Sequence, residues 1–367
     1  MTSVYVYTEP EEEGRPKNTV GSENAQQLVG LAYISQRKGR LSSTFAYAAD
    51  YLASSYSYAI DPELPLQTGS WPATHGMPGC LMDSAPDRWG RNLINKRYPG
   101  RRLTSLDYLL GVSDATRQGA LRFKTEQDGA FQYPDTKIPK LVSLQELLAA
   151  TWAIDSPKKG HEAVRFLLEA GSGSLGGARP KAVVEKEGEL YLAKFPHKSD
   201  QTDVIAAEYY ALQNARKLGM DVPECELIVV GDDNVLLVKR FDRCSVEGAS
   251  RRVPYISAMT ALGATDGEQR DYLEILDFIS RFGSRPKQDR IELLKRIRYT
   301  IEINNTDDHL RNHGFIYEKG GWHLSPLFDI NPNSNEFELR QTALGGCVDA
   351  EGSMQVLEQL ESKQQII

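Results

Sequence analysis

Alternation of apolar and polar residues predicts strands at the start of the chain. Residues 4–7 alternate as a half-buried strand does, and residues 28–34 and 43–47 show the same kind of pattern. A turn is expected at Lys38 and Gly39, because glycine permits the tight backbone that joins two strands. The first fifty residues therefore predict a strand-rich unit.

Helical signals follow this unit. The segment 83–91 is predicted to open a helix, with Asp83 or Ser84 as its cap and Pro86 in its first turn. The other elements expected here are a short helix at 48–53, an irregular stretch at 60–80, a helix at 103–110 and a strand at 119–123. Residues 1–125 thus predict an α+β subdomain, and the polar stretch 124–140 predicts a boundary.

A second region, residues 140–243, mixes helices with strands. Ser143 and Glu146 have the spacing of a capping box before an apolar run, which predicts a helix start. The helix expected at 162–170 ends at Gly171. The remaining predicted elements are strands at 182–185, 190–195, 227–230 and 235–238 and an amphipathic helix at 204–218.

The last region, residues 244–367, is predicted to be mainly helical. Helices are expected at 272–282 and 289–303, the second one capped by Asp289 and Glu292. A small hairpin is expected at 314–324. A strand-rich lobe before a helical lobe is an α+β arrangement with two lobes.

Composition narrows the class of protein. The 367 residues are 40% hydrophobic and 25% charged, which is ordinary for a globular protein, and they provide an ample core. The net charge of −7 disfavours wrapping nucleic acid over a basic face, although a local basic patch is compatible with it. Four scattered cysteines, no signal-peptide pattern and no apolar run of bilayer length favour a cytoplasmic protein without membrane contact.

Candidate chemistry concentrates in residues 304–314, which hold carboxylates, imidazoles, amides and a guanidinium. Asp307 and Asn312 lie five residues apart, and Asp329 follows an apolar strand. In phosphoryl transfer an Asp accepts the hydroxyl proton, an Asn holds a metal, and a later Asp holds metal against the phosphates. Asp308 competes with Asp307 for the role of the base, and the five-residue step to Asn312 favours Asp307.

Metal chemistry allows two interpretations. His309 and His313 are four residues apart and can bind zinc if that stretch is helical, but no third ligand follows the known zinc spacings. Asp329 lies between Phe328 and Ile330, where a carboxylate needs a partner that Mg²⁺ would supply.

A glycine-rich loop is the second candidate. Gly173 to Gly177 can present backbone N–H groups to phosphates, although such a loop alone is more often a linker. Lys181 and Lys194 can contact phosphates, and Glu208 on the following helix can pair with Lys194 as kinases pair a strand lysine with a helix glutamate.

Together these motifs resemble the HipA-type serine/threonine kinases, the toxin halves of bacterial toxin–antitoxin pairs. The resemblance covers nearly the whole chain, and five motifs in order are more specific than any one of them. It is carried by 174–181, Lys194-Phe195-Pro196, 239–243, 305–312 and Phe328-Asp329-Ile330, together with N-terminal matches at 45–52, 83–91 and 119–123.

The resemblance implies a two-lobed protein-kinase-like fold that binds ATP and Mg²⁺. It makes Asp307 the proton-accepting base, Asn312 and Asp329 the Mg²⁺ ligands, and Ser174 the autophosphorylated serine, with Ser172 as an alternative. A phosphate on Ser174 would eject its loop and inactivate the enzyme. The implied ATP contacts are Gly176, Gly177, Ala178, Arg179, Pro180, Lys181, Lys194, Lys239, Arg240, Phe241 and His309.

The resemblance also implies partners. These are a DNA-binding antitoxin of HipB type, with DNA reached mainly through it, and a translation component such as an aminoacyl-tRNA synthetase as target. Only a short tail follows Asp329, where the family continues with several more helices, so the helical lobe is expected to be abbreviated or the chain truncated. A small-molecule phosphotransferase and a catalytically silent corepressor are the alternative readings.

Overall fold

The computed structural model describes residues 1–9, 26–37, 40–132, 138–172, 179–246, 249–318, 320–335 and 337–364. Its N-terminal part is an antiparallel five-stranded sheet in the order β4-β3-β2-β1-β5. The three strands predicted there are present, while the turn predicted at Lys38 and Gly39 lies outside the described residues. The strands are β1 (Thr2–Thr8), β2 (Gln27–Arg37), β3 (Arg40–Tyr47), β4 (Trp71–Pro72) and β5 (Arg122–Lys124).

Four helices accompany this sheet: α1 (Ala49–Leu52), α2 (Gly79–Asp83), α3 (Arg88–Arg97) and α4 (Ser105–Leu110). The cap predicted for the helix at 83–91 is wrong. Asp83 ends α2 and accepts hydrogen bonds from N and Oγ of Ser257 at 2.7 and 2.6 Å. Asp87 caps α3 instead, because its Oδ1 accepts from the Gly90 N–H at 2.7 Å.

The second region forms a four-stranded antiparallel sheet in the order β6-β7-β9-β8, with helices α5 and α6 before it and α7 inserted. The capping box predicted at Ser143 does not form. A 3-10 turn at Leu141–Ser143 leads into α5, so the Ser143 side chain makes no capping bond. The elements are α5 (Leu144–Ala153), α6 (Gly160–Glu169), β6 (Lys181–Lys186), β7 (Glu189–Lys194), α7 (Val204–Lys217), β8 (Cys225–Val230) and β9 (Asp233–Lys239).

The last region is mainly helical, as predicted. Its long helix α10 starts at Pro286, since proline suits a first turn, so Asp289 and Glu292 lie inside the helix rather than at its cap. The helices are α8 (Ala258–Ala261), α9 (Tyr272–Phe282), α10 (Pro286–Glu302) and α11 (Ala350–Gln364). The strands are β10 (Arg243–Val246), β11 (Ala249–Arg252), β12 (Tyr255–Ser257), β13 (Arg270–Asp271), β14 (Gly314–Glu318), β15 (Gly321–Leu324) and β16 (Thr342–Ala343).

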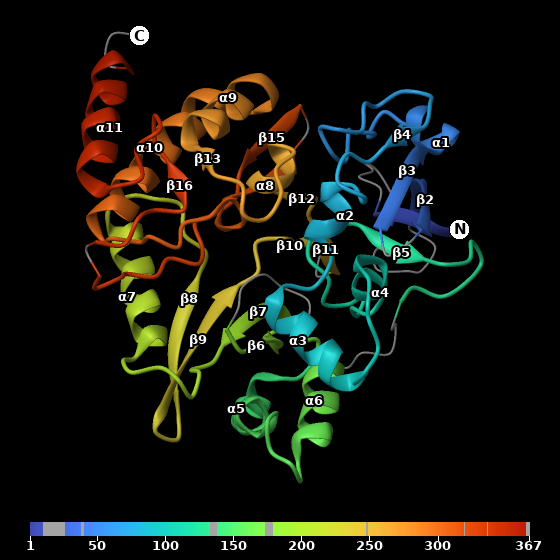
Figure 1. The fold of residues 1–367 in the computed structure, drawn as a ribbon, viewed down its shortest axis with the longest axis horizontal. Coiled ribbons are helices and arrows are strands. Elements are labelled where there is room, and N and C mark those ends of the chain that lie inside the picture. Colours follow the sequence, from blue (N-terminus) through green and yellow to red (C-terminus); the bar gives the residue numbers. More distant parts are fainter. Residues whose placement is uncertain are drawn as a thin grey trace.

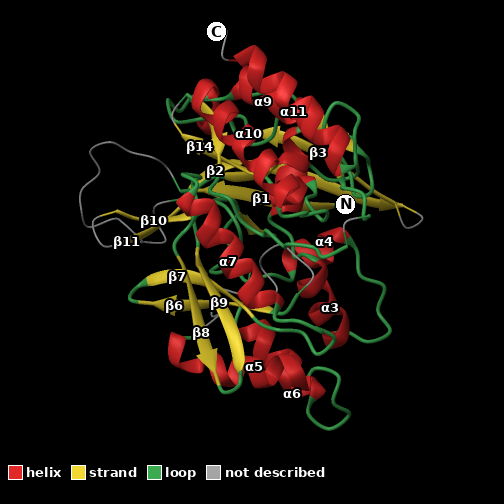
Figure 2. Ribbon diagram, turned by 90° about the vertical axis from the view of Figure 1, so that its left-hand side faces the viewer, coloured by secondary structure: helices red, strands yellow, loops and turns green. Residues whose placement is uncertain are grey.

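The N-terminal sheet packs against the C-terminal helices. One cluster of buried side chains contains Val6 and Phe45 from this sheet together with Tyr272, Ile297 and Leu357 from α9, α10 and α11. In Figure 2 the helices α9 to α11 lie on one side of the sheet and the four-stranded sheet β6–β9 lies on the other. Burial of this apolar surface fixes the N-terminal part to the helical lobe.

Helix α3 joins the N-terminal part to the four-stranded sheet. Its Trp89 and Leu93 belong to the same buried cluster as Leu167 of α6, Val184 of β6 and Ala193 of β7. Figure 1 shows α3 running beside α6. None of the helices in the described residues has the length and apolar character needed to cross a membrane.

A buried ionic cluster fixes the segment 116–119 to the residues that follow β9. The Asp242 carboxylate accepts hydrogen bonds from Arg240 at 2.8 and 2.6 Å, from Arg243 at 3.0 Å and from the Gly119 N–H at 2.7 Å. The two guanidinium groups also donate to the carbonyl oxygen of Arg117 at 3.0 and 2.6 Å. The three charged side chains are at most 7% exposed, so this network is part of the core.

Candidate active site

The loop after α10 begins with a residue in the left-handed conformation. Asn304 has φ of +53°, a value that asparagine tolerates better than most residues. Its side-chain amide donates to the carbonyl oxygens of Asn333 and Asn335, both at 2.9 Å. The loop that carries Asp307 is thereby tied to the segment after Asp329.

Asp307 and Asn312 lie together, as their spacing predicts. The Asn312 Nδ2 donates to the Asp307 carbonyl oxygen at 3.0 Å, and Gln341 Nε2 donates to the Asp307 Oδ1 at 2.5 Å. Partial burial raises the pKa of the Asp307 carboxyl, and the charge of Asp329 raises it further while His309 opposes both. A raised pKa makes this carboxylate a better proton acceptor.

Asp308 has a different environment. It is 3% exposed, and its Oδ1 lies 3.1 Å from Nε2 of His313. Its Oδ2 accepts a hydrogen bond from the Tyr272 hydroxyl. Burial would raise the Asp308 pKa, but His313, Tyr272 and Arg340 lower it below its ordinary value. A carboxylate that stays ionised and has several buried partners is suited to stabilising the conformation of the loop.

Asp329 sits opposite a buried lysine. It has φ of +59°, which is uncommon for a non-glycine residue and is found at functional sites. The Lys194 Nζ lies 2.7 Å from its Oδ1 and 2.5 Å from Oε1 of Glu208. Burial opposes ionisation of Asp329, but Lys194, followed by Lys181 and His309, lowers its pKa to about 2. The pairing of Lys194 with Glu208 that the sequence suggested is therefore present.

A second buried lysine, Lys181, is paired with a carboxylate of the N-terminal part. Lys181 Nζ lies 2.7 Å from Oδ2 of Asp87, and the two side chains are 3% and 8% exposed. The charge of Lys181 also contributes, after that of Lys194, to the lowered pKa of Asp329. The two lysines expected to contact phosphate are therefore both buried and each is paired with a carboxylate, Lys181 with Asp87 and Lys194 with Asp329.

Of the implied ATP contacts Lys239, Arg240 and Phe241, only Phe241 has its side chain beside the site. Phe241 lies beside Phe328, with ring centroids 5.4 Å apart, next to Asp329. The side chains of Lys239 and Arg240 are engaged elsewhere, Lys239 with Glu189 and Arg240 in the ionic cluster with Asp242. The structure therefore brings Phe241 to the site. The backbone N–H groups of Lys239 and Arg240 also have protein partners, since they donate to the carbonyl oxygens of Glu224 and Leu190 at 2.8 and 2.9 Å.

The glycine-rich loop is only partly described. Ser174, Gly176, Gly177 and Ala178 lie outside the described residues. Pro180 is buried beside Lys181, and Arg179 is paired with Asp200 at 2.6 Å, so its side chain has a protein partner.

The ligand chemistry favours magnesium over zinc. His313, one of the two histidines considered as zinc ligands, faces Asp308 with its Nε2 3.1 Å from the carboxylate. Because Asn312 donates through Nδ2, its amide oxygen is left as an acceptor. The Oδ1 of Asn331, two residues after Asp329, is buried without a partner among the described residues. Carboxylate and amide oxygens are the ligands that Mg²⁺ prefers.

Three residues at the site were not predicted. Asp87 comes from the N-terminal part, 94 positions before Lys181, and Gln341 and Tyr272 hold the two aspartates of the loop. Asp87 was noticed only as part of a helix start, and no local pattern marks Gln341 or Tyr272. Such long-range pairs cannot be read from spacing.

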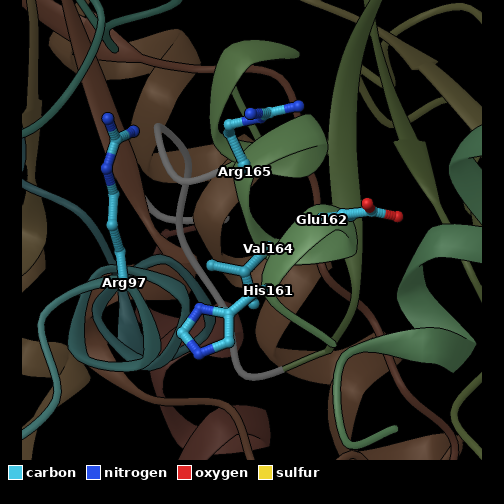
Figure 3. Close-up of a pocket in the computed structure, with 5 residues that line it drawn as sticks. All are labelled: Arg97, His161, Glu162, Val164 and Arg165. Carbon is cyan, nitrogen blue, oxygen red and sulfur yellow. The ribbon is translucent and has the colours of Figure 1, made fainter. Parts of the chain in front are cut away.

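Cavities elsewhere do not contain these residues. A cavity of about 250 Å³ between α3 and α6 is lined by Arg97, His161, Glu162, Val164 and Arg165. Figure 3 shows the Glu162 side chain pointing away from Arg97, so these groups do not converge on one point. A larger cavity of about 910 Å³ lies among α3, α4 and α6 and also lacks Asp307 and Asp329.

The fold and this site define a two-lobed, kinase-like α+β protein. A family model for the HipA-like C-terminal domain matches residues 173–364, and one for the HipA N-terminal domain matches residues 26–124. The chain belongs to the HipA family.

Known relatives agree with this assignment. The chain is 27% identical over 159 residues to a putative kinase of Haemophilus influenzae, covering 40% of this chain and 46% of that protein. It is 23% identical over 145 residues to the serine/threonine-protein kinase toxin HipA of Shewanella oneidensis, covering 35% and 34%. These matches span less than half the length of either relative.

A solved structure shows the same fold. The chain is similar in structure to a protein chain in the solved complex of Shewanella oneidensis HipA, HipB and operator DNA, with a TM-score of 0.64 and 17% sequence identity. The likeness covers 89% of this chain and 79% of that one. The two-lobed fold class expected from the sequence is confirmed.

Proposed function

We propose that the chain is an ATP- and Mg²⁺-dependent serine/threonine protein kinase of HipA type. The observation that carries the proposal is Lys194, which bridges Glu208 and Asp329 at 2.5 and 2.7 Å. A strand lysine held by a helix glutamate beside a metal-binding aspartate is the arrangement that kinases use to hold ATP.

In this proposal each group has one task. Asp307 accepts the proton of the attacking hydroxyl, and Gln341 orients its carboxylate. Asn312 and Asp329 hold Mg²⁺, which neutralises charge on the phosphates. Lys194 and Lys181 bind the phosphates, and Phe241 and His309 border the nucleotide, where Nδ1 of His309 is buried without a partner among the described residues.

A protein substrate fits the surface beside the base. Phe337 and Leu339 are 93% and 61% exposed, although the Phe337 N–H is fixed by Asn335 Oδ1 at 3.2 Å. Both belong to the segment that leads to Gln341 and hence to Asp307. Exposed apolar side chains in the segment that leads to Gln341 offer contact area for a polypeptide, which a small phosphate acceptor would not need.

Self-regulation through Ser174 is part of the proposal. Ser172 is 1% exposed, and its hydroxyl donates to the carbonyl oxygen of Lys181, so it is a poor phosphate acceptor. Ser174 is therefore preferred as the autophosphorylated residue. The added negative charge would repel the ATP phosphates and switch the enzyme off.

The biological role follows from the family. We infer a cytoplasmic toxin of a toxin–antitoxin pair whose partner is a DNA-binding antitoxin of HipB type, and whose target is a translation component such as an aminoacyl-tRNA synthetase. The complex of the Shewanella protein with HipB and operator DNA supports the antitoxin. The proposed domains are an N-terminal subdomain (1–125), a nucleotide-binding lobe (140–243) and a catalytic helical lobe (244–367).

Labelled ATP tests this function. Wild type incubated with γ-labelled ATP and Mg²⁺ should incorporate phosphate at Ser174, located by mass spectrometry, and Ser174→Ala should stay active without switching itself off. Transfer of the label only to small metabolites would favour a small-molecule phosphotransferase. A chain that binds the antitoxin but transfers no label would be a silent corepressor.

A further inference from the structure

Asp87 and Lys181 form an ion pair that joins the N-terminal part to the nucleotide site. Asp87 uses one oxygen to cap α3 through Gly90 and the other to hold Lys181 at 2.7 Å. The pair is almost completely buried. Burial of a lysine ammonium group is costly unless a carboxylate compensates its charge, and Asp87 supplies such a carboxylate at 2.7 Å.

The same helix also holds the backbone of Lys181. Trp89, two residues after Asp87, donates from its indole N–H to Ser172 Oγ at 3.3 Å. The Ser172 hydroxyl in turn donates to the carbonyl oxygen of Lys181. Trp89 is 3% exposed within the cluster that contains β6 and β7. Side chain and backbone of Lys181 are therefore both fixed from α3.

The carboxylate proposed to bind the metal, Asp329, has a lysine partner of its own. Lys194 already neutralises Asp329 at 2.7 Å. The two lysines of the site thus have separate carboxylate partners, Asp87 for Lys181 and Asp329 for Lys194.

From these contacts we propose that Asp87 is a positioning residue for ATP, holding Lys181 toward the phosphates, so that the N-terminal part completes the nucleotide site. The inference rests on the proposed function and goes beyond it by making ATP affinity depend on a residue outside the two kinase lobes. Displacement of α3 would then weaken ATP binding without any change in the residues that perform the chemistry.

The test is Mg²⁺-ATP binding by calorimetry to the full chain and to Asp87→Asn, Lys181→Met and the double variant. Asn caps a helix about as well as Asp, so Asp87→Asn removes the charge and keeps the bond to Gly90. We expect Kd to rise at least about tenfold in each single variant, and the double variant to match Lys181→Met within about twofold, as for two residues that act through one contact. The matched control is Asp155→Asn, which removes an exposed partner of Lys96 on the same helix and should leave Kd unchanged.

Steady-state kinetics separate positioning from folding. Asp87→Asn should raise KM for ATP and retain most of kcat at saturation, whereas partial unfolding would lower kcat. If Asp87→Asn does not fold, the comparison of Lys181→Met with the neutral double variant still tests the inference, because the inference predicts that these two variants bind ATP with equal Kd. If Asp87→Asn binds ATP with wild-type affinity, or if the double variant binds ATP more weakly than Lys181→Met, the inference is overturned and the proposed function stands. A wild-type chain that binds no ATP overturns the proposed function and the inference with it.

Discussion

Replacement of Asp242 by Asn should destabilise the whole molecule. Asp242 neutralises Arg240 and Arg243, whose side chains are 3% and 7% exposed, and it accepts the Gly119 N–H. Removal of one partner from a buried ion pair costs about 3–5 kcal/mol, because the other charge stays buried without compensation. The substitution also weakens the attachment of residues 116–119.

The expected change in melting temperature follows from chain length. At about 2.1 cal per mol per kelvin per residue, 367 residues give an unfolding entropy of about 0.8 kcal per mol per kelvin. For cooperative unfolding, a loss of about 3–5 kcal/mol then lowers Tm by about 4–6 °C. Differential scanning calorimetry at neutral pH measures this shift.

The pH dependence gives the same experiment a second readout. The Asp242 pKa lies far below its ordinary value because Arg240 and Arg243 outweigh the opposing effect of burial. A lowered folded-state pKa gives stability that is present above the unfolded-state pKa of about 4 and is lost as the pH falls below it. The Tm gap between wild type and Asp242→Asn should therefore be constant at neutral pH and shrink in acid.

A surface pair provides the control. Asp277→Asn removes an exposed i,i+4 partner of Arg281, a pair that contributes at most about 0.5 kcal/mol, so Tm should move by less than about 1 °C. An equally small shift for Asp242→Asn would refute the view that this cluster stabilises the contact between the N-terminal part and the lobes.

Three further predictions concern the base and its surroundings. Gln341→Leu removes the N–H that stabilises ionised Asp307, so kcat should fall several-fold and the acidic limb of the pH–rate profile should move to higher pH. Glu338→Gln removes a negative charge that raises the Asp307 pKa, so the same limb should move to lower pH; a limb that does not move contradicts that coupling. Phe337→Ser combined with Leu339→Ser should raise KM for a protein substrate and leave KM for ATP unchanged, and equal phosphorylation kinetics would exclude this surface from substrate binding.

Local patterns predicted most of the elements. Gly171 and Gly219 adopt φ of +70° and +78° just after α6 and α7, as expected of glycines that end helices. Local capping signals failed where neighbouring structure competed. Ser143 belongs to a 3-10 turn and does not cap α5. Asp289 accepts a hydrogen bond from the Leu324 N–H at 3.2 Å and does not cap α10.

The site was predictable to the extent that its residues are close in sequence. Asp307 and Asn312 share one loop, and Lys194 and Glu208 meet across the turn from β7 to α7. The contact of Asp87 with Lys181 could not be predicted, since it depends on how α3 packs in the folded molecule. The five-residue step to Asn312 already favoured Asp307 over Asp308 as the base, and the buried partners of Asp308 add a structural reason for that choice.

The central claim is that Asp307 acts as the base of phosphoryl transfer. Its most direct test is single-turnover transfer from ATP by wild type and Asp307→Asn, with Mg²⁺-ATP affinity measured on both. The account predicts similar affinity and a transfer rate about 10²–10⁴-fold lower in the variant, the range that general-base catalysis contributes. Transfer at the wild-type rate by Asp307→Asn would contradict it.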